Sequence, residues 1–392
     1  MNTTGRQAAI TGVGVSAVGR RLGRGATDLT VEAALAALKH AGLTRDDIDG
    51  VTTYPGQMHS SPGMSPIGCP EIREALGLKV NWHSSSAEGP AQLSAIMIAA
   101  MAVATGQARH VMCFRTLTES SSQTATQRAS VVGGGLARVD PRWQFLLPFN
   151  AASAANWSAM FAQAYMHRFG ATREMLAHVS LNQRANAALN PLAVLRKPLT
   201  LDEYMSTRMI SSPLCMLDCD IPVDGSAVII ISAMDAARDL PHRPIRIEAM
   251  GSAHHGRESW DQRADITTMA AHDAAAQLWS RTDLKPSDVD VACLYDGFSI
   301  HTLMWLEAFG FCKHGEAAAF VAGGHTKIGA QLPLNTNGGQ LSAGRLHAFG
   351  HVVEACTQLW GEAGARQVAN AQVAAVGAGG GPIGGALLLT RQ

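Results

Sequence analysis

The sequence predicts a layered α/β protein made of two similar halves, and three observations lead to this prediction. Segments with apolar residues at helical spacing alternate with short β-branched runs such as Val228–Ile231 and Val373–Val376. Residues 43–54, LTRDDIDGVTTY, align without a gap on residues 284–295, LKPSDVDVACLY. Each copy follows an alanine-rich amphipathic segment. The alternation predicts mixed, largely parallel sheets covered by helices on both faces.

The repeated unit is predicted to be a helix, a polar turn and a strand. Its helices are expected at Val31–Ala41 and Thr268–Trp279, where apolar positions recur at helical spacing. A second repeat follows, because an alanine-rich helix leads into a strand at Gln92–Phe114 and again at Val352–Val376. Two matches in the same order indicate a duplicated architecture.

The repeats divide the chain into an N-terminal half, residues 1–240, and a C-terminal half, residues 241–392, with the break near Asp235–Pro244. A loop excursion from the first half is expected at about residues 115–200. Within it, Thr118–Asn150 is rich in Ser, Gly, Gln and Arg and shows no clear period, which predicts a long loop. Such a loop covers an active site or only pads the surface.

The composition limits the kinds of partner. The 392 residues are 47% hydrophobic and carry 31 basic and 31 acidic side chains. A chain of this size buries a sizeable core. A formal charge of zero offers no electrostatic footprint for nucleic acid or a membrane surface, so neither is an expected partner.

Targeting signals and cysteine usage predict the compartment. Met1–Leu22 has no continuous apolar stretch, which argues against a secretory signal. The longest apolar run, Ala95–Ala104, is far shorter than the roughly 20 residues that cross a bilayer, and it predicts a buried helix. Seven cysteines without a C-x-x-C pair fit a reducing compartment and predict neither a disulfide framework nor a zinc site. A cytoplasmic protein is therefore expected.

Several sequence blocks together resemble the thiolase superfamily, and within it the sterol-carrier-type, thiolase-like lipid transfer protein and steroid side-chain aldolase group. These blocks are AAITGVGVSAVG near the start, residues 182–224, LYDGFS, NTNGGQLSAGRLHAFG at Asn335–Gly350, GEAGARQV, and GAGGGPIGGALLL near the end. The resemblance covers nearly the whole chain. It implies the thiolase fold, with two βαβ-rich halves in an αβαβα sandwich.

The catalytic groups of thiolases are absent from these blocks. Sterol-carrier thiolases read N-x-x-G-G-x-x-S-x-G-H-P where this chain has Gly344-Arg345-Leu346-His347. Their nucleophilic Cys falls at Ser84, and their second Cys falls at Gly377. An arginine stays protonated and cannot exchange a proton as imidazole does, and a serine is a poor nucleophile without a base. The ordinary thiolase reaction is therefore not expected.

The resemblance still implies a thioester-binding scaffold. Backbone N–H groups at a helix start over Ser84, Ser85 and Ser86 and in the Gly379–Gly381 turn are expected to bind a developing oxyanion. The expected substrate-binding and oxyanion-binding positions are Ser84, Ser85, Asp296, Gly339 and Gly380. In the alternative interpretation, these glycines only allow tight packing and unusual backbone angles.

Tyr295, in the Tyr295-Asp296-Gly297-Phe298 motif, is the candidate catalytic base. Thiolases carry N-E-A-F or H-D-C-F at this strand end, and the resemblance to steroid side-chain aldolases implies a catalytic tyrosine here. Some of those proteins have another tyrosine just after GGQLS, where this chain has Ala343. An ordinary core aromatic is the alternative.

Arg345 and His347 are the other catalytic candidates. A free tyrosine has a pKa of about 10, so a nearby cation would help it act as a base. Structural pairing of Arg345 or His347 with a carboxylate such as Asp296 or Glu354 is the alternative. His254, His255 and His351 lack further ligands at metal spacing, so no metal site is expected. The segment Asp218-Cys219-Asp220 resembles the L-D-C turn of the thiolase family and is expected to be structural.

The expected reaction is retro-aldol cleavage of a β-hydroxyacyl-CoA, of which a sterol or bile-acid side chain is one candidate, into a carbonyl product and a short acyl-CoA. One alternative is an acyltransferase or condensing subunit that uses a partner's nucleophile. Another is a non-catalytic acyl-CoA or lipid carrier. The coenzyme A thioester is the substrate, and no cofactor is expected on this chain. The resemblance also implies a homodimer and a small partner subunit with an OB-fold and a zinc ribbon.

Overall fold

The computed structural model describes residues 7–59, 61–85, 90–123, 144, 146–257, 259–261 and 263–392. Strands of these residues form a nine-stranded sheet in the order β3-β2-β4-β7-β1-β8-β11-β10-β9. The strands of the sheet are β1 (Ala8–Val15), β2 (Gly50–Thr53), β3 (Trp82–Ser85), β4 (His110–Thr118), β7 (Asp224–Ala233), β8 (Ile245–Gly251), β9 (Val291–Leu294), β10 (Val373–Ala378) and β11 (Gly385–Arg391). A separate hairpin consists of β5 (Met209–Ser211) and β6 (Leu214–Cys215).

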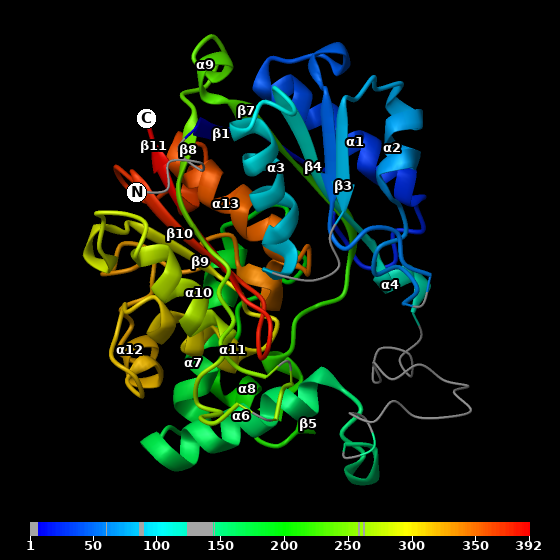
Figure 1. Ribbon diagram of the computed structural model, residues 1–392. Coiled ribbons are helices and arrows are strands. Elements are labelled where there is room, and N and C mark those ends of the chain that lie inside the picture. The colour runs from blue at the N-terminus through cyan, green and yellow to red at the C-terminus, as the bar shows by residue number, and fades with distance from the viewer. Residues whose placement is uncertain are drawn as a thin grey trace.

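Helices cover the sheet on both outer faces and also lie between its two halves (Figure 1). The α-helices are α1 (Ala26–Ala41), α2 (Cys69–Leu76), α3 (Ser94–Ala104), α4 (Glu119–Ser122), α6 (Ala154–Phe169), α7 (Arg173–Ala188), α8 (Leu201–Met205), α9 (Met234–Ala237), α10 (Ala270–Trp279), α11 (Ser299–Ala308), α12 (Ala317–Ala322) and α13 (Ala348–Trp360). A short 3₁₀ turn, η3 (Ala91–Leu93), precedes α3, and a π-helical turn, η8 (Gly339–Ala343), precedes α13.

The alternation of side chains along the strands produces the layers. On β4, Phe114 packs with α1 and α2, whereas its neighbour Cys113 packs in the central core with α3 and α13. On β9, Leu294 packs with α10 and α11, whereas Cys293 faces the same central core. The central core thus lies between the two sheet halves, where Figure 1 shows α3 and α13, and one further apolar core covers the outer face of each half. The predicted αβαβα layering is confirmed.

The predicted largely parallel pairing is wrong. Only β2 with β3, β2 with β4, and β9 with β10 run parallel, and the other five pairings in the sheet are antiparallel. Two connections cause this result. The chain returns from its long excursion as β7, antiparallel to β4, and β10 turns directly back into β11. The helix-strand alternation in the sequence does not show either reversal.

The repeated segments occupy corresponding positions. The stretches 43–54 and 284–295 contribute β2 and β9, which follow α1 and α10 respectively. Strands from residues 1–240 form one part of the sheet, and strands from residues 241–392 form the other. The predicted loop Thr118–Asn150 lies mostly outside the described residues, while α6, α7 and α8 of the excursion lie together beyond one end of the sheet (Figure 1).

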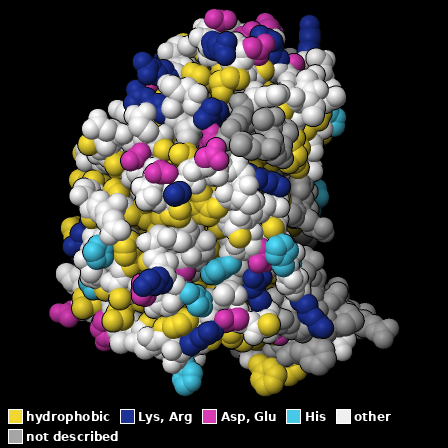
Figure 2. Space-filling view, turned by 60° about the vertical axis from the view of Figure 1, so that its left-hand side comes forward, with side chains coloured by type: hydrophobic (Ala, Val, Ile, Leu, Met, Phe, Trp, Pro, Cys, Tyr) yellow, Lys and Arg dark blue, Asp and Glu magenta, His cyan; other side chains and the backbone are white. Residues whose placement is uncertain are grey.

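The surface and the helices agree with the composition. On the face shown in Figure 2, basic and acidic side chains are interspersed, and no area of one charge sign extends across it. Among the described residues, no helix is both long enough and apolar enough to cross a membrane. All seven cysteines are free thiols.

Candidate active site

Tyr295 lies directly after β9, where the strand leaves the sheet. Its backbone N–H donates to the carbonyl oxygen of Gly377 on β10 at 3.0 Å, so the strand pairing fixes its backbone. The ring lies over Gly297, because a methyl group at that glycine would be 2.6 Å from the Tyr295 hydroxyl oxygen. The side chain is partly exposed, and its hydroxyl makes no hydrogen bond to the residues that the structure describes. The phenol therefore remains available to a ligand.

Asp296 holds the glycine-rich turn η8 in place. Its Oδ1 accepts the Gln340 N–H at 2.9 Å, and its Oδ2 accepts the Leu341 N–H at 3.4 Å. A methyl group at Gly339 would lie 1.9 Å from Oδ2, and Gly339 has a φ of +58°. Both the close contact and the backbone conformation therefore exclude a side chain at this position. The carboxylate is thus an acceptor occupied by backbone N–H groups. In this geometry Asp296 and Gly339 position η8, whereas the sequence predicted that they contact an oxyanion.

Arg345, just after η8, joins two carboxylates from the other half of the chain. Its Nη2 lies 2.6 Å from Glu119 Oε2, and its Nη1 lies 3.0 Å from Asp220 Oδ1. The alternative that Arg345 pairs with a buried carboxylate therefore agrees with the structure, but the partners are Glu119 and Asp220. The two examples named from the sequence are engaged elsewhere, since Asp296 binds η8 and Glu354 pairs with Arg366 at 3.0 Å. One guanidinium therefore faces two carboxylates, whose side chains are only 4% and 9% exposed.

The excess of negative charge changes how this cluster binds protons. Burial raises the pKa of Asp220 to about 7, Arg345 counteracts that rise, and Glu119 adds to it. Burial alone would lower the pKa of Arg345, but Asp220 and Glu119 raise it, so the guanidinium stays charged. Asp220 consequently exchanges a proton near neutral pH, which suits a general base.

The phenol of Tyr295 is neutral at the same pH. Burial raises its pKa, the negative charge of Asp220 raises it further, and Arg345 only partly opposes both effects. Arg345 therefore acts in the direction expected of a nearby cation, but burial and Asp220 outweigh it in the free protein. Tyr295 needs a partner that accepts its proton, and Asp220 is the nearby group whose pKa suits that task.

His347 is a buried neutral base that binds an arginine. Its Nδ1 accepts hydrogen bonds from Nε and Nη2 of Arg115 at 3.1 and 3.0 Å. Burial lowers the pKa of His347 well below its ordinary value, and Arg115 and Arg345 lower it further. His347 thus supplies no positive charge to Tyr295. Arg115 also donates to the Tyr54 carbonyl oxygen at 2.8 Å, which brings a second tyrosine to this side of the site.

Gly380 and His301 complete the other side of the site. The His301 ring stacks on Tyr295 with centroids 6.0 Å apart and an interplanar angle of 26°. A methyl group at Gly380 would lie 2.7 Å from Cε1 of His301. Gly377, at the position of the second thiolase Cys, has no room for a thiol, because its Cβ would lie 2.7 Å from the Trp305 ring.

Ser84 and Ser85 do not join this cluster. Both lie in β3, paired with Thr52 and Thr53 of β2, at the sheet edge opposite β9. The prediction of a helix start at Ser84 and Ser85 is therefore wrong. Within the described residues the helical segment begins at Ala91, and a methyl group at Gly379 would lie 3.0 Å from the Ala91 Cβ. The helix start that meets the C-terminal glycine turn thus carries no nucleophile at Ala91.

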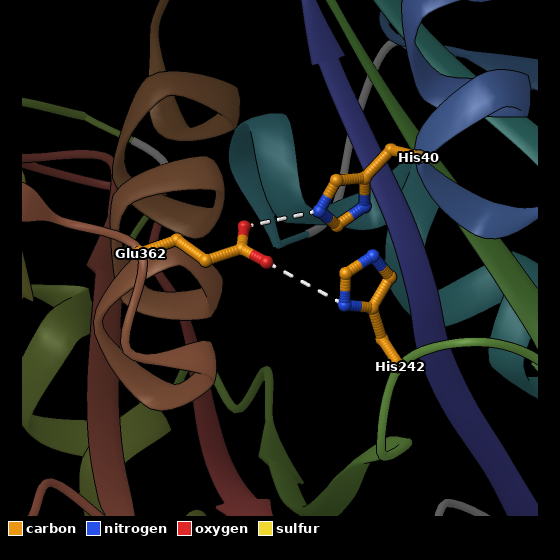
Figure 3. Close-up of side chains that lie close together, drawn as sticks. All are labelled: His40, His242 and Glu362. Atoms are coloured by element: carbon orange, nitrogen blue, oxygen red, sulfur yellow. Dashed lines mark hydrogen bonds and ion pairs between the residues drawn. The ribbon is translucent and has the colours of Figure 1, made fainter.

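Two groups of side chains in the described part of the chain have the composition of a metal site. In the first, shown in Figure 3, His40 Nε2 lies 3.1 Å and His242 Nδ1 lies 3.5 Å from Glu362. His40 Nδ1 accepts the Val13 N–H at 3.4 Å, so the ring proton occupies Nε2, the atom that a metal would need. The two rings are stacked 4.2 Å apart with 9° between their planes, so their lone pairs do not converge. The cluster fits a hydrogen-bonded seam between the halves better than a metal site.

The second group, His272, Glu307 and His314, is also committed to internal contacts. His314 Nδ1 lies 2.8 Å from Glu307, and its Nε2 lies 3.1 Å from Thr267. Glu307 also accepts a hydrogen bond from the Tyr165 hydroxyl group. With both nitrogens of His314 in use, this group lacks a set of free ligands.

Three residues at this site are absent from the sequence-based expectations: Tyr54, Glu119 and His301. Asp220 was expected only as part of a structural turn. Asp218 and Asp220 stand in one motif, but the structure separates them, since Asp218 binds Tyr204 at 2.7 Å and Asp220 binds Arg345. His301 has a weak signal, because it follows Tyr295 by six residues in a mostly apolar helix. The ion pair of Glu119 with Arg345 crosses between the halves, and the contact of Tyr54 with Arg115 joins residues 61 positions apart, so neither leaves a local pattern.

A layered α/β scaffold in which a phenol, an arginine and two carboxylates meet near the end of β9 defines the class of protein. Residues 251–389 match the family model described as Thiolase C-terminal domain-like. The chain is 37% identical over 357 residues to a steroid side-chain-cleaving aldolase of Thermomonospora curvata, with 89% of each chain covered. It is 33% identical to the 17-hydroxy-3-oxo-4-pregnene-20-carboxyl-CoA lyase of Mycobacterium tuberculosis, with 91% of this chain and 92% of that protein covered.

Solved structures agree with these relatives. The structure described as Ltp2-ChsH2(DUF35) aldolase superposes with a TM-score of 0.87 at 33% identity and covers 98% of both chains. Human mitochondrial 3-ketoacyl-CoA thiolase superposes with a TM-score of 0.68 at 15% identity and shares the fold alone. The chain belongs to the thiolase superfamily, in the group that contains the steroid side-chain-cleaving aldolases.

Proposed function

We propose that the protein is a carbon–carbon lyase that cleaves a β-hydroxyacyl-CoA with a steroid side chain by a retro-aldol reaction. The observation that carries this proposal is the set of groups around Tyr295. An unbonded phenol lies close enough to Asp220 for that carboxylate to raise its pKa, and the Asp220 carboxyl group exchanges its proton near neutrality. The positions of the two thiolase cysteines, Ser84 and Gly377, carry no thiol. The names of the T. curvata and M. tuberculosis relatives support the same reaction.

The chain's own groups balance the proton transfers of this reaction. Tyr295 accepts the proton of the substrate β-hydroxyl while its own proton passes to Asp220. The O–H electron pair becomes the new carbonyl bond, and the electron pair of the broken carbon–carbon bond forms the thioester enolate. The proton then returns from Asp220 through Tyr295 to the enolate carbon. One proton is taken and one is given back, so no external acid, base or oxidant is needed.

Arg345 sets the protonation equilibrium of this pair. It compensates the charge of Asp220 and Glu119, so that Asp220 is deprotonated in a useful fraction of molecules near pH 7. The hydrogen bonds from Arg115 to His347 fix the segment that follows η8. Neither residue exchanges a proton in this scheme. A retro-aldol step does not require the nucleophilic Cys of thiolases, because no acyl-enzyme forms.

We also propose a homodimer that works with a small zinc-ribbon and OB-fold partner. The solved Ltp2-ChsH2(DUF35) aldolase, by its name, pairs a related chain with a second subunit, which supports a partner here. Seven free thiols support a cytoplasmic location. The acyl-CoA is the substrate, and this chain is proposed to carry no cofactor of its own.

The test is turnover of 17-hydroxy-3-oxo-4-pregnene-20-carboxyl-CoA by the purified chain, alone and with a zinc-ribbon partner subunit. Cleavage to a ketone and a short acyl-CoA is expected, and Tyr295→Phe should lower kcat by about 10²- to 10⁴-fold. Tyr165→Phe is a matched control, because the Tyr165 hydroxyl is committed to a hydrogen bond with Glu307, whereas the Tyr295 hydroxyl has no partner within the described residues. Unchanged turnover in Tyr295→Phe would remove the phenol from the mechanism. Tight binding without cleavage would identify a carrier instead.

A further inference from the structure

His301 has a buried ring nitrogen without a partner. The residue lies in α11 and is 1% exposed. Its Nε2 lies 3.2 Å from the Ser158 hydroxyl oxygen, whereas its Nδ1 has no hydrogen-bond partner in the described part of the chain. A buried polar atom without a partner costs about 1–3 kcal/mol. Such an atom beside a proposed active site points to a ligand.

The partner of Nε2 determines where the ring proton lies. Ser158 is fully buried, and its hydroxyl has no other hydrogen bond within the described residues. If the hydroxyl donates to Nε2, the ring proton is on Nδ1, and one buried polar group lacks a partner. The opposite tautomer leaves two such groups, the hydroxyl hydrogen and the Nδ1 lone pair. The count favours a proton on Nδ1.

The surroundings keep this imidazole neutral. The rings of Phe161, Trp260 and Phe298 lie 6.4, 5.8 and 5.5 Å from the His301 ring, measured between centroids. Burial lowers the pKa of His301 to about 3. The ring is therefore uncharged across the physiological range and can donate a hydrogen bond without exchanging a proton.

Two donors then lie on the same side of Tyr295. A methyl group at Gly380 would lie 2.8 Å from His301 Nδ1, so the glycine backbone lies directly against this nitrogen. The Gly380 N–H makes no hydrogen bond to the described residues. The ring of Tyr295 stacks on His301, whose Nδ1 lies against Gly380. This arrangement suits an oxygen that gains negative charge, since it offers two preorganised donors.

We propose that the His301 Nδ1–H and the Gly380 N–H together bind the thioester oxygen of the substrate as it becomes the enolate oxygen. This inference rests on the proposed lyase function. When the carbon–carbon bond breaks, its electron pair forms the new carbon–carbon double bond of the enolate, and the thioester carbonyl pair moves onto the oxygen. His301 keeps its proton throughout. Ser158 is a positioning residue, because it fixes the tautomer.

A pair of isosteric variants tests the donor directly. The amide nitrogen of Asn occupies the place of Nδ1, whereas that of Gln occupies the place of Nε2. His301→Gln should therefore lower kcat by about 10²- to 10³-fold, the usual cost of one oxyanion donor, and His301→Asn should lose clearly less. Both variants should keep the pH dependence that Asp220 sets. Nitrogen-15 NMR of the wild-type chain should place the ring proton on Nδ1.

The outcomes separate this proposal from the lyase function. If the wild type cleaves the thioester and His301→Gln matches its kcat, or if the ring proton is on Nε2, the donor role is wrong and the lyase stands. If the wild type does not cleave the thioester, both proposals fail. Equal melting temperatures of the two variants establish that folding does not explain the difference. If His301→Gln does not fold, the NMR tautomer of the wild type decides.

Discussion

Replacing Gly297 with alanine tests where the Tyr295 phenol lies. The added methyl group would be 2.6 Å from the Tyr295 hydroxyl oxygen and ring edge, whereas ordinary contacts begin at 3.4 Å. The difference is about 0.8 Å, and the three atoms nearest to the added group all belong to the Tyr295 side chain. Gly297 does not have a positive φ, so the backbone accepts alanine without strain. The ring must therefore move by nearly 1 Å.

A displacement of this size affects activity more than stability. A misplacement of about 1 Å lowers catalysis by roughly 10²-fold, whereas one extra methyl group in a packed site costs about 1–3 kcal/mol. We expect Gly297→Ala to fold and bind acyl-CoA but to lose about 10²-fold in kcat. Gly350→Ala is the control, because its nearest contact would be an ordinary 3.5 Å.

The assay is steady-state cleavage of the steroid thioester combined with thermal unfolding. In the double variant Gly297→Ala with Tyr295→Phe, the two losses in kcat should not add, because both remove the same positioned hydroxyl. Additive losses, or a Gly297→Ala enzyme with wild-type kcat, would refute the placement of the phenol.

The remaining predictions concern the carboxylates and η8. The kcat/KM of the wild type should fall below about pH 7, because Asp220 must be deprotonated to accept a proton. Asp220→Asn should abolish this acidic limb, and Glu119→Gln should move it to lower pH, since Glu119 raises the pKa of Asp220; identical profiles in all three proteins would contradict the assignment. Because the pKa of Asp220 rises from 3.8 to about 7 on folding, the folded state disfavours its charge, and wild-type stability should decrease as pH rises through this window, by at most about 4 kcal/mol. Urea unfolding of Asp220→Asn should show a flatter pH dependence from pH 4 to 8, and an unchanged slope would count against the raised pKa. Gly339→Ala should lower the melting temperature more than Gly361→Ala does, because both positions have positive φ but only Gly339 meets the Asp296 carboxylate; equal shifts would mean that the contact is unimportant.

The layers of the fold could be predicted from the sequence because each strand and helix carries its own pattern. The repeat around β2 and β9 also indicated the duplication. Strand direction could not be predicted, since β7 and β11 owe their orientation to connections that have no periodic signal. The helix start expected at Ser84 and Ser85 failed for a related reason. A run of serines is typical of a helix cap, yet its pairing with β2 places it in a strand.

The candidate site was predictable where one motif contains the group and its neighbours. Tyr295 and Asp296 belong to such a motif, and the structure places them beside Gly297 and Gly339. The partners of Arg345 were not predictable, because Glu119 lies 226 residues away in sequence and meets it only through the fold. The pKa of Asp220 likewise depends on burial and on three charges from separate segments. Local sequence patterns therefore predict neither the partners of Arg345 nor the pKa of Asp220.

The most direct test of bond cleavage without an acyl-enzyme is intact-protein mass spectrometry during turnover of the steroid thioester. Retro-aldol cleavage predicts stoichiometric ketone and short acyl-CoA while the mass of the protein chain stays that of the free enzyme. An acyl adduct that forms and decays at the rate of turnover, on this chain or on a partner subunit, would contradict it and favour an acyltransferase.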